Sequence, residues 1–224
     1  MFATTHNTAD IRRYFQNALL KREFTLDKSK CNMIELIGAS FLADSPTIFG
    51  IPNQLYIDKE IAWYDAMSTN IFDMQDPPKQ WVATANKEGD INSNYGYLLY
   101  HHDNHNQYTH VFSELLANAN SRRACAIYNR PSMWLDYDAR GKNDFVCTNA
   151  VTYYIRNNQL HAVVQMRSND VVFGYKNDYA WQSTVLQRLV NNLNHHLEAQ
   201  LKTGTIVWQA QNLHVYERHF DLIK

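Results

Sequence analysis

The sequence has few of the residues that cross-link a chain and no segment that could span a membrane. Cysteine occurs only three times in 224 residues, at positions 31, 125 and 147, and never in a CxxC pair. An odd number of scattered cysteines argues against a disulfide framework or zinc site and predicts thiols in a reducing compartment. No apolar run approaches the roughly 18–20 residues that a membrane span needs. The first residues lack a basic region followed by an apolar one, so we expect no secretory signal and a cytoplasmic protein.

Linkers and charge imbalance are also missing. The seven glycines and five prolines form no Pro/Gly/Ser-rich segment, so the sequence predicts a single domain over residues 1–224. The formal net charge is −1, which gives no reason to expect direct binding to nucleic acid or to a membrane surface. The chain does contain 45% hydrophobic residues and 14 tyrosines, a composition that predicts a globular protein with a full core.

Helical and β-type segments follow one another in an irregular order. Apolar residues at helical spacing predict helices at about 8–20, 56–67, 104–117 and 178–198. β-rich apolar runs predict strands at 33–41, 124–128, 145–155, 160–166 and 205–210. Thr8 is expected to cap the first helix, and Asn157 and Asn158 to form a hairpin turn, because asparagine tolerates positive φ. This order predicts an α+β fold with a mixed, mainly antiparallel sheet flanked by helices.

Two stretches carry basic or reactive residues that a core alone does not need. Arg122 and Arg123 are adjacent before a predicted strand, and paired guanidiniums suit a phosphate, although they could also be solvated charges. Cys147 lies in FVCTNAV, where a thiol is either a small buried hydrophobe or a nucleophile. The second role needs positive charge nearby to hold the thiolate, and Arg167 could supply it.

A third stretch, MRSNDVVFGYKNDYAWQ, ends a predicted strand in a polar cluster over 167–170. Gly174 then allows a tight turn, and Asp178 is expected to begin the long helix. At such a position an acidic side chain could simply cap the helix, where the helix dipole favours negative charge. Alternatively, it could face a ligand together with the polar cluster.

Two histidine-containing stretches complete the set. In the last predicted strand, His214 and Tyr216 point to one face and could hold a ligand hydroxyl, or could be ordinary strand-edge alternation. In HHDNHNQYTH, the spacing of His101, His102 and His105 fits no standard zinc motif. This stretch therefore predicts a solvated turn before a helix, and no metal.

Together these stretches resemble the thymidylate synthase superfamily, from about residue 10 to residue 220. The shared order is paired arginines, a strand cysteine, R-S-x-D, a glycine turn, a polar helix-start residue and H-x-Y. Upstream, KEIAWY resembles the family's helix with a functional glutamate, at Glu60, and GDINSNYG resembles its loop with an active-site tyrosine, at Tyr95. The segments IGASF, RPSM, CTN, MRSNDVVFG and NDYAWQ resemble the branch of deoxycytidylate (dCMP) hydroxymethylases of T-even bacteriophages.

Three positions depart from the synthase pattern. The proline before the cysteine is Val146, the histidine after it is Thr148, and the asparagine at the helix start is Asp178. A neutral amide matches the carbonyl and ring N–H of uracil, whereas a carboxylate accepts from the amine of cytosine and, when protonated, donates to its ring nitrogen. Each mismatched polar group in a buried site would cost about 1–3 kcal/mol. Asp178 therefore favours cytosine over uracil.

The resemblance implies a transferase that moves a one-carbon unit from 5,10-methylenetetrahydrofolate to carbon 5 of dCMP and hydrates it, giving 5-hydroxymethyl-dCMP for modified phage DNA. It implies a homodimer whose sheets pack together and whose arginines are shared across subunits. It also implies possible association with phage or host nucleotide-synthesis enzymes in the host cytoplasm.

The residues that this resemblance implicates fall into three groups. The catalytic residues are Cys147, Glu60, Asp178 and Tyr95. The substrate-binding residues are Arg122, Arg123, Arg167, Ser168, Asn169, Asp170, His214, Tyr216 and Lys28. The folate side is assigned to Trp81 and Gly174.

Two alternatives remain at this stage. One is a dUMP hydroxymethylase or a thymidylate synthase, against which Asp178 argues. The other is a non-catalytic nucleotide-binding protein that keeps the fold. Against it stand the intact Cys147, Arg167, Glu60 and Tyr95.

Overall fold

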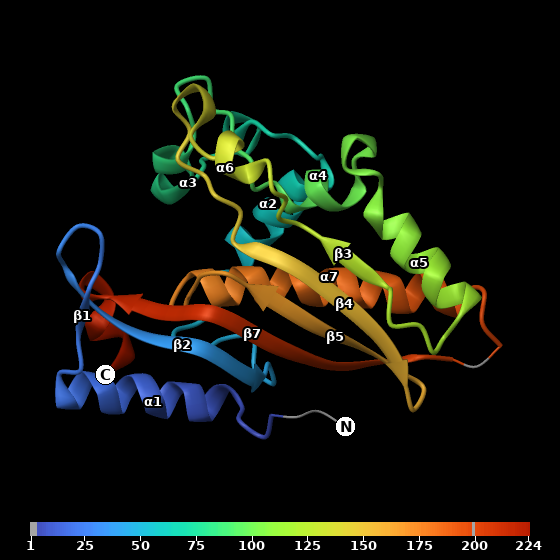
Figure 1. Cartoon of the computed structure of the whole chain (residues 1–224), viewed down its shortest axis with the longest axis horizontal. Coiled ribbons are helices and arrows are strands. Elements are labelled where there is room, and N and C mark those ends of the chain that lie inside the picture. The colour runs from blue at the N-terminus through green and yellow to red at the C-terminus, as the bar shows by residue number, and fades with distance from the viewer. Residues whose placement is uncertain (1–3, 199) are drawn as a thin grey trace. The chain divides into compact units, whose positions relative to one another are not determined.

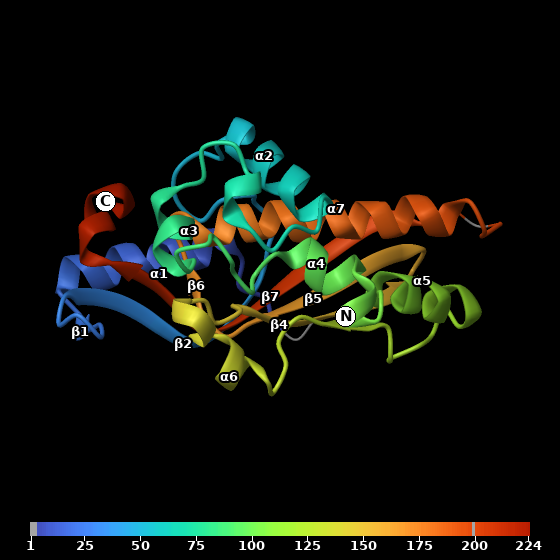
Figure 2. The ribbon, with the colours of Figure 1, turned by 90° about the horizontal axis from the view of Figure 1, so that it is seen from above.

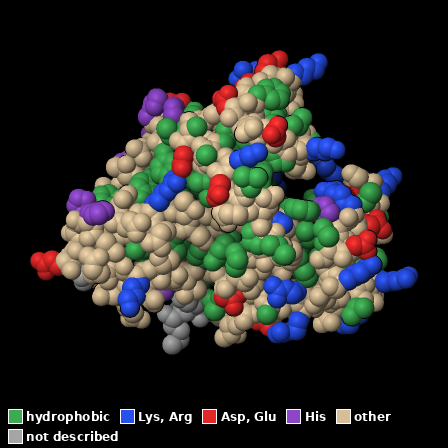
Figure 3. All heavy atoms as spheres, turned by 180° about the vertical axis from the view of Figure 1, so that it is seen from behind, with side chains coloured by type: hydrophobic (Ala, Val, Ile, Leu, Met, Phe, Trp, Pro, Cys, Tyr) green, Lys and Arg blue, Asp and Glu red, His purple; other side chains and the backbone are tan. Residues whose placement is uncertain are grey.

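The computed structural model describes residues 4–198 and 200–224 and divides into two compact units. Met1–Pro52 and Tyr153–Lys224 form the first, which we call the sheet unit, and Asn53–Thr152 form the second, which we call the helical unit. Figure 1 shows the elements of both. Charges of both signs are interspersed over the face drawn in Figure 3, in keeping with a net charge of −1.

The sheet unit is built around a mixed sheet with the order β1-β2-β7-β5-β4, and β6 pairs with β7. The strands are β1 (Thr25–Leu26), β2 (Asn32–Leu42), β4 (Thr148–Arg156, which belongs to this unit from Tyr153 onward), β5 (Gln159–Met166), β6 (Asn169–Asp170) and β7 (Lys202–Tyr216). β2 is antiparallel to β7, whereas β5 and β6 are parallel to it. Asn157 and Asn158 have φ of 51° and 57°, so the predicted hairpin turn between β4 and β5 is confirmed.

Two long helices cover this sheet. α1 (Thr8–Lys21) packs on β2, and α7 (Gly174–Asn194) packs along β5 and β7, as Figure 2 shows from above. α7 buries Val185, Leu189 and Leu193 at the four-residue spacing seen in the sequence. The cap of α1 is Asn7, not Thr8, because the Asn7 side chain accepts from the N–H groups of the first turn. The chain ends in a 3₁₀ segment, Glu217–Ile223.

The helical unit consists mainly of short helices. They are α2 (Gln54–Asp65), α3 (Lys79–Thr84), α4 (Tyr95–Tyr100), α5 (Gln107–Ala117), α6 (Met133–Asp136) and the 3₁₀ turns Ile71–Asp73, His102–Asn104 and Ala139–Gly141. β3 (Cys125–Ile127) pairs antiparallel with the first half of β4. Gly96 lets α4 approach α2 closely, because a Cβ there would lie 1.7 Å from the carbonyl oxygen of Tyr64. Among the described residues, no helix is long and apolar enough to cross a membrane.

Several predicted boundaries are wrong in ways that matter for the site. α7 begins at Gly174, one turn before Asp178, so Asp178 lies inside the helix and does not cap it. The chain turns early because Oδ1 of Asp170 accepts the N–H groups of Val172, Phe173 and Gly174. β4 begins at Thr148, so Cys147 immediately precedes the strand instead of lying within it.

Candidate active site

In the sheet unit, a buried polar chain fixes the side chain of Asp178. Nε1–H of Trp208 donates to Oδ1 of Asn169 at 3.2 Å, and Nδ2–H of Asn169 donates to Oδ2 of Asp178 at 2.7 Å. Asn169 is 3% exposed and Trp208 is fully buried. Because an indole N–H can only donate, it determines which end of the amide faces Asp178. The carboxylate of Asp178 is therefore held by a donor whose orientation is set from β7.

Asp170 and Gly174 shape the backbone around this chain. Although burial acts to raise it, the pKa of Asp170 is held below its usual value by the nearby His219 and by the backbone N–H of Phe173. A Cβ at Gly174 would lie 3.3 Å from Nδ2 of Asn169, so this glycine leaves room for the Asn169–Asp178 hydrogen bond. Their predicted contacts with substrate and folate stay predictions.

His214 and Tyr216 lie near the end of β7 with ring centroids 4.8 Å apart. Nδ1 of His214 is 3.1 Å from Oδ1 of Asn212, and burial lowers the pKa of His214 below its usual value. The imidazole is thus favoured in its neutral form, which can donate to or accept from a sugar hydroxyl. The contact between the two rings agrees with the prediction that both side chains lie on one face of the strand.

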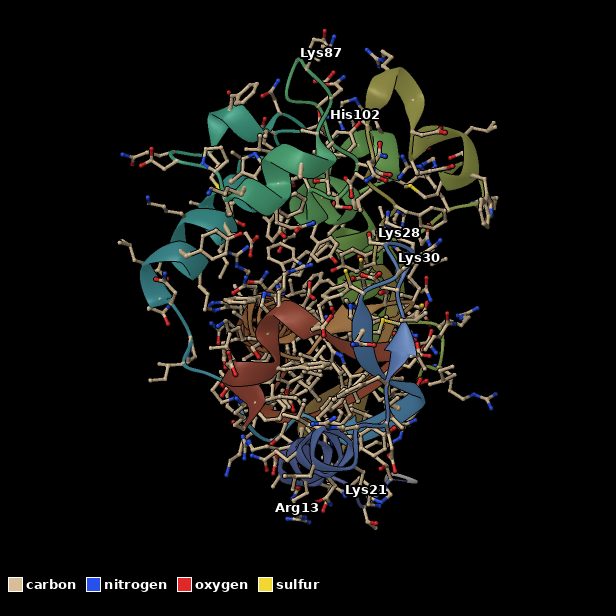
Figure 4. All side chains as sticks on the ribbon, turned by 90° about the vertical axis from the view of Figure 1, so that its left-hand side faces the viewer. Arg13, Lys21, Lys28, Lys30, Lys87 and His102 are labelled. Atoms are coloured by element: carbon tan, nitrogen blue, oxygen red, sulfur yellow. The ribbon has the colours of Figure 1, made fainter. Side chains whose placement is uncertain are left out.

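The basic residues of the sheet unit lie in different settings. Lys28 and Lys30 are exposed near the tip of the β1–β2 loop (Figure 4). The loop is shaped by Oδ1 of Asp27, which accepts the N–H groups of Ser29 and Cys31. Arg167 and Ser168 are half-buried and lie between β5 and β6, directly before Asn169.

In the helical unit, the carboxylate of Glu60 on α2 accepts two hydrogen bonds. Tyr56 Oη–H donates to Oε1 of Glu60 at 2.5 Å, and Trp81 Nε1–H donates to the same oxygen at 3.0 Å. Trp81 Nε1 is also 3.1 Å from Oη of Tyr56. Glu60 is 5% exposed, and burial raises its pKa even though both hydrogen bonds act to lower it. A carboxyl whose pKa is raised by burial holds its proton more tightly than an exposed one, which suits a general acid or base.

Trp81, which was predicted only for the folate side, also donates a hydrogen bond to Glu60. Its indole is half-buried and meets Trp63 edge to face at 5.3 Å, so one part of the ring remains exposed while its N–H holds Glu60. Its place on the folate side stays a prediction. Tyr95, at the start of α4, is 4% exposed and packs against Tyr64 and Tyr128.

Cys147 is half-buried, and its Sγ lies 3.8 Å from the carbonyl oxygen of Phe145. It is a thiol, as are Cys31 and Cys125. The residues on either side, Val146 and Thr148, are fully buried and anchor the backbone on both sides of it. The Cys147 thiol is thus partly accessible and not fully buried in the core, and its role as a nucleophile stays a prediction.

The two adjacent arginines before β3 differ in their contacts. Arg123 forms an ion pair with Glu114 at 3.1 Å, and Glu114 also accepts from Ser121 at 2.6 Å. Arg122 is exposed, and no described residue hydrogen-bonds or ion-pairs with its guanidinium. Phosphate binding stays a prediction for both residues, and Arg123 would have to leave or share Glu114 to take part in it.

The histidine-rich turn groups His101, His102 and Asp103, not the three histidines considered in the sequence. The possible ligand atoms of these residues lie within 4.8 Å of one another. Asp103 is engaged by the hydroxyl of Tyr97 at 2.8 Å, and that hydrogen bond lowers its pKa below the usual value. His105 instead ends the 3₁₀ turn with a φ of 62°.

The sequence-predicted residues thus fall into two groups. The sheet unit holds Lys28, Arg167, Ser168, Asn169, Asp170, Gly174, Asp178, His214 and Tyr216, and the helical unit holds Glu60, Trp81, Tyr95, Arg122, Arg123 and Cys147. Sequence reasoning missed Tyr56 and Trp208. Tyr56 lies four residues before Glu60 on one helix face, a spacing that could have revealed it. No sequence pattern links Trp208 to Asn169.

Comparison with known proteins places this arrangement in a family. The sequence model of the thymidylate synthase family matches residues 54–224. The chain is 47% identical over 225 residues to the deoxycytidylate 5-hydroxymethyltransferases of Enterobacteria phages T4 and T6, covering 100% of this chain and 92% of each relative. It is 28% identical over 167 residues to the thymidylate synthase of Fusobacterium nucleatum, covering 73% of this chain and 57% of that protein. The chain belongs to the thymidylate synthase family.

Proposed function

We propose that this protein is a dCMP hydroxymethylase, which transfers a one-carbon unit from 5,10-methylenetetrahydrofolate to carbon 5 of dCMP and hydrates it to 5-hydroxymethyl-dCMP. The observation that carries the proposal is the carboxylate at position 178, held by Asn169 at 2.7 Å inside α7. A carboxylate accepts from the exocyclic amine that cytosine has and uracil lacks. The relatives from phages T4 and T6 bear the matching name.

The covalent chemistry is assigned to Cys147. Its thiolate attacks carbon 6 of the pyrimidine, which makes carbon 5 nucleophilic, and carbon 5 then takes the one-carbon unit. Asp178 favours the attack by protonating the ring nitrogen, so the developing negative charge is neutralised. Removal of the proton from carbon 5 and elimination of tetrahydrofolate then leave an exocyclic methylene on carbon 5. Water adds to this methylene, and departure of the cysteine restores the 5,6 double bond.

Proton transfers fall to Glu60, with Tyr95 and ordered water. The raised pKa of Glu60, caused by its burial, suits a group that must gain and lose a proton. Glu60 is also assigned as the base for the water, because the hydration step releases a proton when the new C–O bond forms. Trp81 and Gly174 are assigned to the folate side.

Nucleotide binding is assigned to polar and basic groups. Arg167, Ser168 and Lys28 would contact the phosphate together with Arg122 and Arg123 of a second copy in a homodimer. His214 and Tyr216 would hold the deoxyribose hydroxyl, with Asn169 and Asp170 supporting the base side. The residues belong to both units, so we propose that 1–224 act as one catalytic domain. The product would serve modified phage DNA, and association with other enzymes of nucleotide synthesis would fit that role.

A direct test compares dCMP and dUMP carrying tritium at carbon 5, each with methylenetetrahydrofolate. We expect faster tritium release from dCMP; faster release from dUMP would contradict the assignment and favour a dUMP enzyme. Asp178→Asn should shift the preference toward dUMP, and unchanged selectivity would remove our explanation of it. Cys147→Ser should abolish turnover, and normal turnover would contradict the covalent mechanism.

A further inference from the structure

The contacts of Glu60 are distributed unevenly over its two carboxylate oxygens. The hydrogen bonds that the described residues give it, from Tyr56 and from Trp81, both end on Oε1. Oε1 is therefore saturated by two donors. Neither donor contacts Oε2. Although only 5% of the Glu60 side chain is exposed, Oε2 is therefore the oxygen that remains for a water molecule.

Tyr56 has the geometry to fix this arrangement. It lies four residues before Glu60 on α2, so the two side chains share one face of the helix. Its hydroxyl donates to Oε1 and lies 3.1 Å from Nε1 of Trp81, so the polar groups of Tyr56, Glu60 and Trp81 all contact one another. Removing the hydroxyl would leave one donor on a buried carboxylate, which could then rotate and lose the distinction between its oxygens.

The hydroxyl also supports the charged form of the base. Burial raises the pKa of Glu60, and the Tyr56 hydrogen bond is the largest influence that opposes this rise. Without it, the pKa of Glu60 would rise further, and the ionised form that can take a proton from water would be less favoured.

We propose that Tyr56 is the positioning residue for the hydration step, holding Glu60 so that Oε2 takes the proton of the attacking water. This inference rests on the proposed function. In the step, the water oxygen bonds to the exocyclic methylene and its proton passes to Oε2. The methylene π electrons move into the ring, and the C6–S bond to Cys147 then breaks as the 5,6 double bond re-forms. Water is the only co-reactant, and the thiolate is regenerated.

Tyr56→Phe tests the proposal, because it removes the hydroxyl and keeps the ring. The assay contains 5-tritiated dCMP, methylenetetrahydrofolate and 2-mercaptoethanol, since a thiol adds to an exocyclic methylene that water fails to reach. Tritium release reports the steps before hydration, and mass analysis separates the hydroxymethyl product from the thioether. We expect tritium release to continue while the ratio of hydroxymethyl to thioether product falls about tenfold or more, as expected for loss of a hydrogen bond to a charged group.

Tyr97→Phe is the matched control. It removes another tyrosine hydroxyl that donates to a carboxylate of the helical unit, that of Asp103, and should leave the product ratio unchanged. Circular dichroism melts of both variants report folding. A Tyr56→Phe enzyme whose tritium release and hydroxymethyl product fall in parallel, or whose ratio is unchanged, would overturn the proposal. A wild-type enzyme that makes no hydroxymethyl product from dCMP would instead contradict the proposed function itself.

Discussion

Replacing Asn169 with leucine would test whether the buried polar chain behind Asp178 stabilises the fold as the structure indicates. The substitution keeps the approximate shape but removes the acceptor for Trp208 Nε1–H and the donor to Asp178. A buried donor left unsatisfied costs about 1–3 kcal/mol, and a hydrogen bond to a charged group contributes about 1.5–3 kcal/mol. We therefore expect Asn169→Leu to lower the free energy of unfolding by about 2–5 kcal/mol.

A double-mutant cycle with Trp208→Phe isolates the link to β7. In the wild-type protein, Trp208→Phe removes indole volume and also leaves Oδ1 of Asn169 without its donor, in a side chain that is 3% exposed. In the Asn169→Leu background it removes the same volume but relieves an unsatisfied N–H. The loss of packing cancels in the cycle, so the coupling free energy should be about 1–3 kcal/mol.

Urea unfolding followed by fluorescence and circular dichroism supplies the four free energies. Trp63→Phe in both backgrounds is the control, because Trp63 is also buried but donates to the backbone carbonyl of Asn70 in the helical unit. That pair of substitutions should be additive. If the effects of Asn169→Leu and Trp208→Phe add within about 0.5 kcal/mol, the hydrogen bond from Trp208 does not stabilise Asn169 as the structure indicates.

Three further predictions concern other residues. Gly96→Ala should destabilise the protein by more than about 3 kcal/mol, because its Cβ would meet the Tyr64 carbonyl oxygen at 1.7 Å, and an unchanged urea midpoint would contradict this close approach. Because burial raises the pKa of Glu60, the folded chain binds this proton more tightly than the unfolded chain, so this contribution to stability is complete below the ordinary value of 4.5 and is lost as pH rises through the folded pKa. The Glu60→Gln variant lacks that loss, so its stability relative to wild type should increase with pH in urea titrations, and a pH-independent difference would argue against it. Gln182 is 1% exposed and neither end of its amide has a hydrogen-bond partner among the described residues, so Gln182→Met should raise the unfolding free energy by about 1–3 kcal/mol, whereas a large loss of stability would reveal a hidden partner.

Much of the fold could be predicted because its signals are local. The spacing of Val185, Leu189 and Leu193 identified the long helix, and the Asn157–Asn158 pair identified the hairpin. The start of that helix could not be predicted, because it depends on Asp170, whose Oδ1 accepts N–H groups of three following residues. Local preference alone placed the start at Asp178.

The site followed a similar division. Cys147, Glu60 and Asp178 were predicted from a joint pattern of short motifs. The family that this pattern indicates is confirmed, whereas the roles of the three residues stay predictions. The groups that hold these residues were not visible, because Trp208 on β7 and Asn169 on β6 are brought together only by the folded sheet. The difference between Arg122 and Arg123 likewise depends on Glu114, which lies on α5. Tertiary contacts of this kind leave no fixed spacing in a sequence.

Whether this protein is a dCMP hydroxymethylase is decided by the mass of the nucleotide that it forms from dCMP and methylenetetrahydrofolate. We expect dCMP that has gained a hydroxymethyl group. Asp178 selects cytosine as the base, and water, not hydride, adds to the exocyclic methylene. A product that has gained a methyl group, or conversion of dUMP with no product from dCMP, would contradict it.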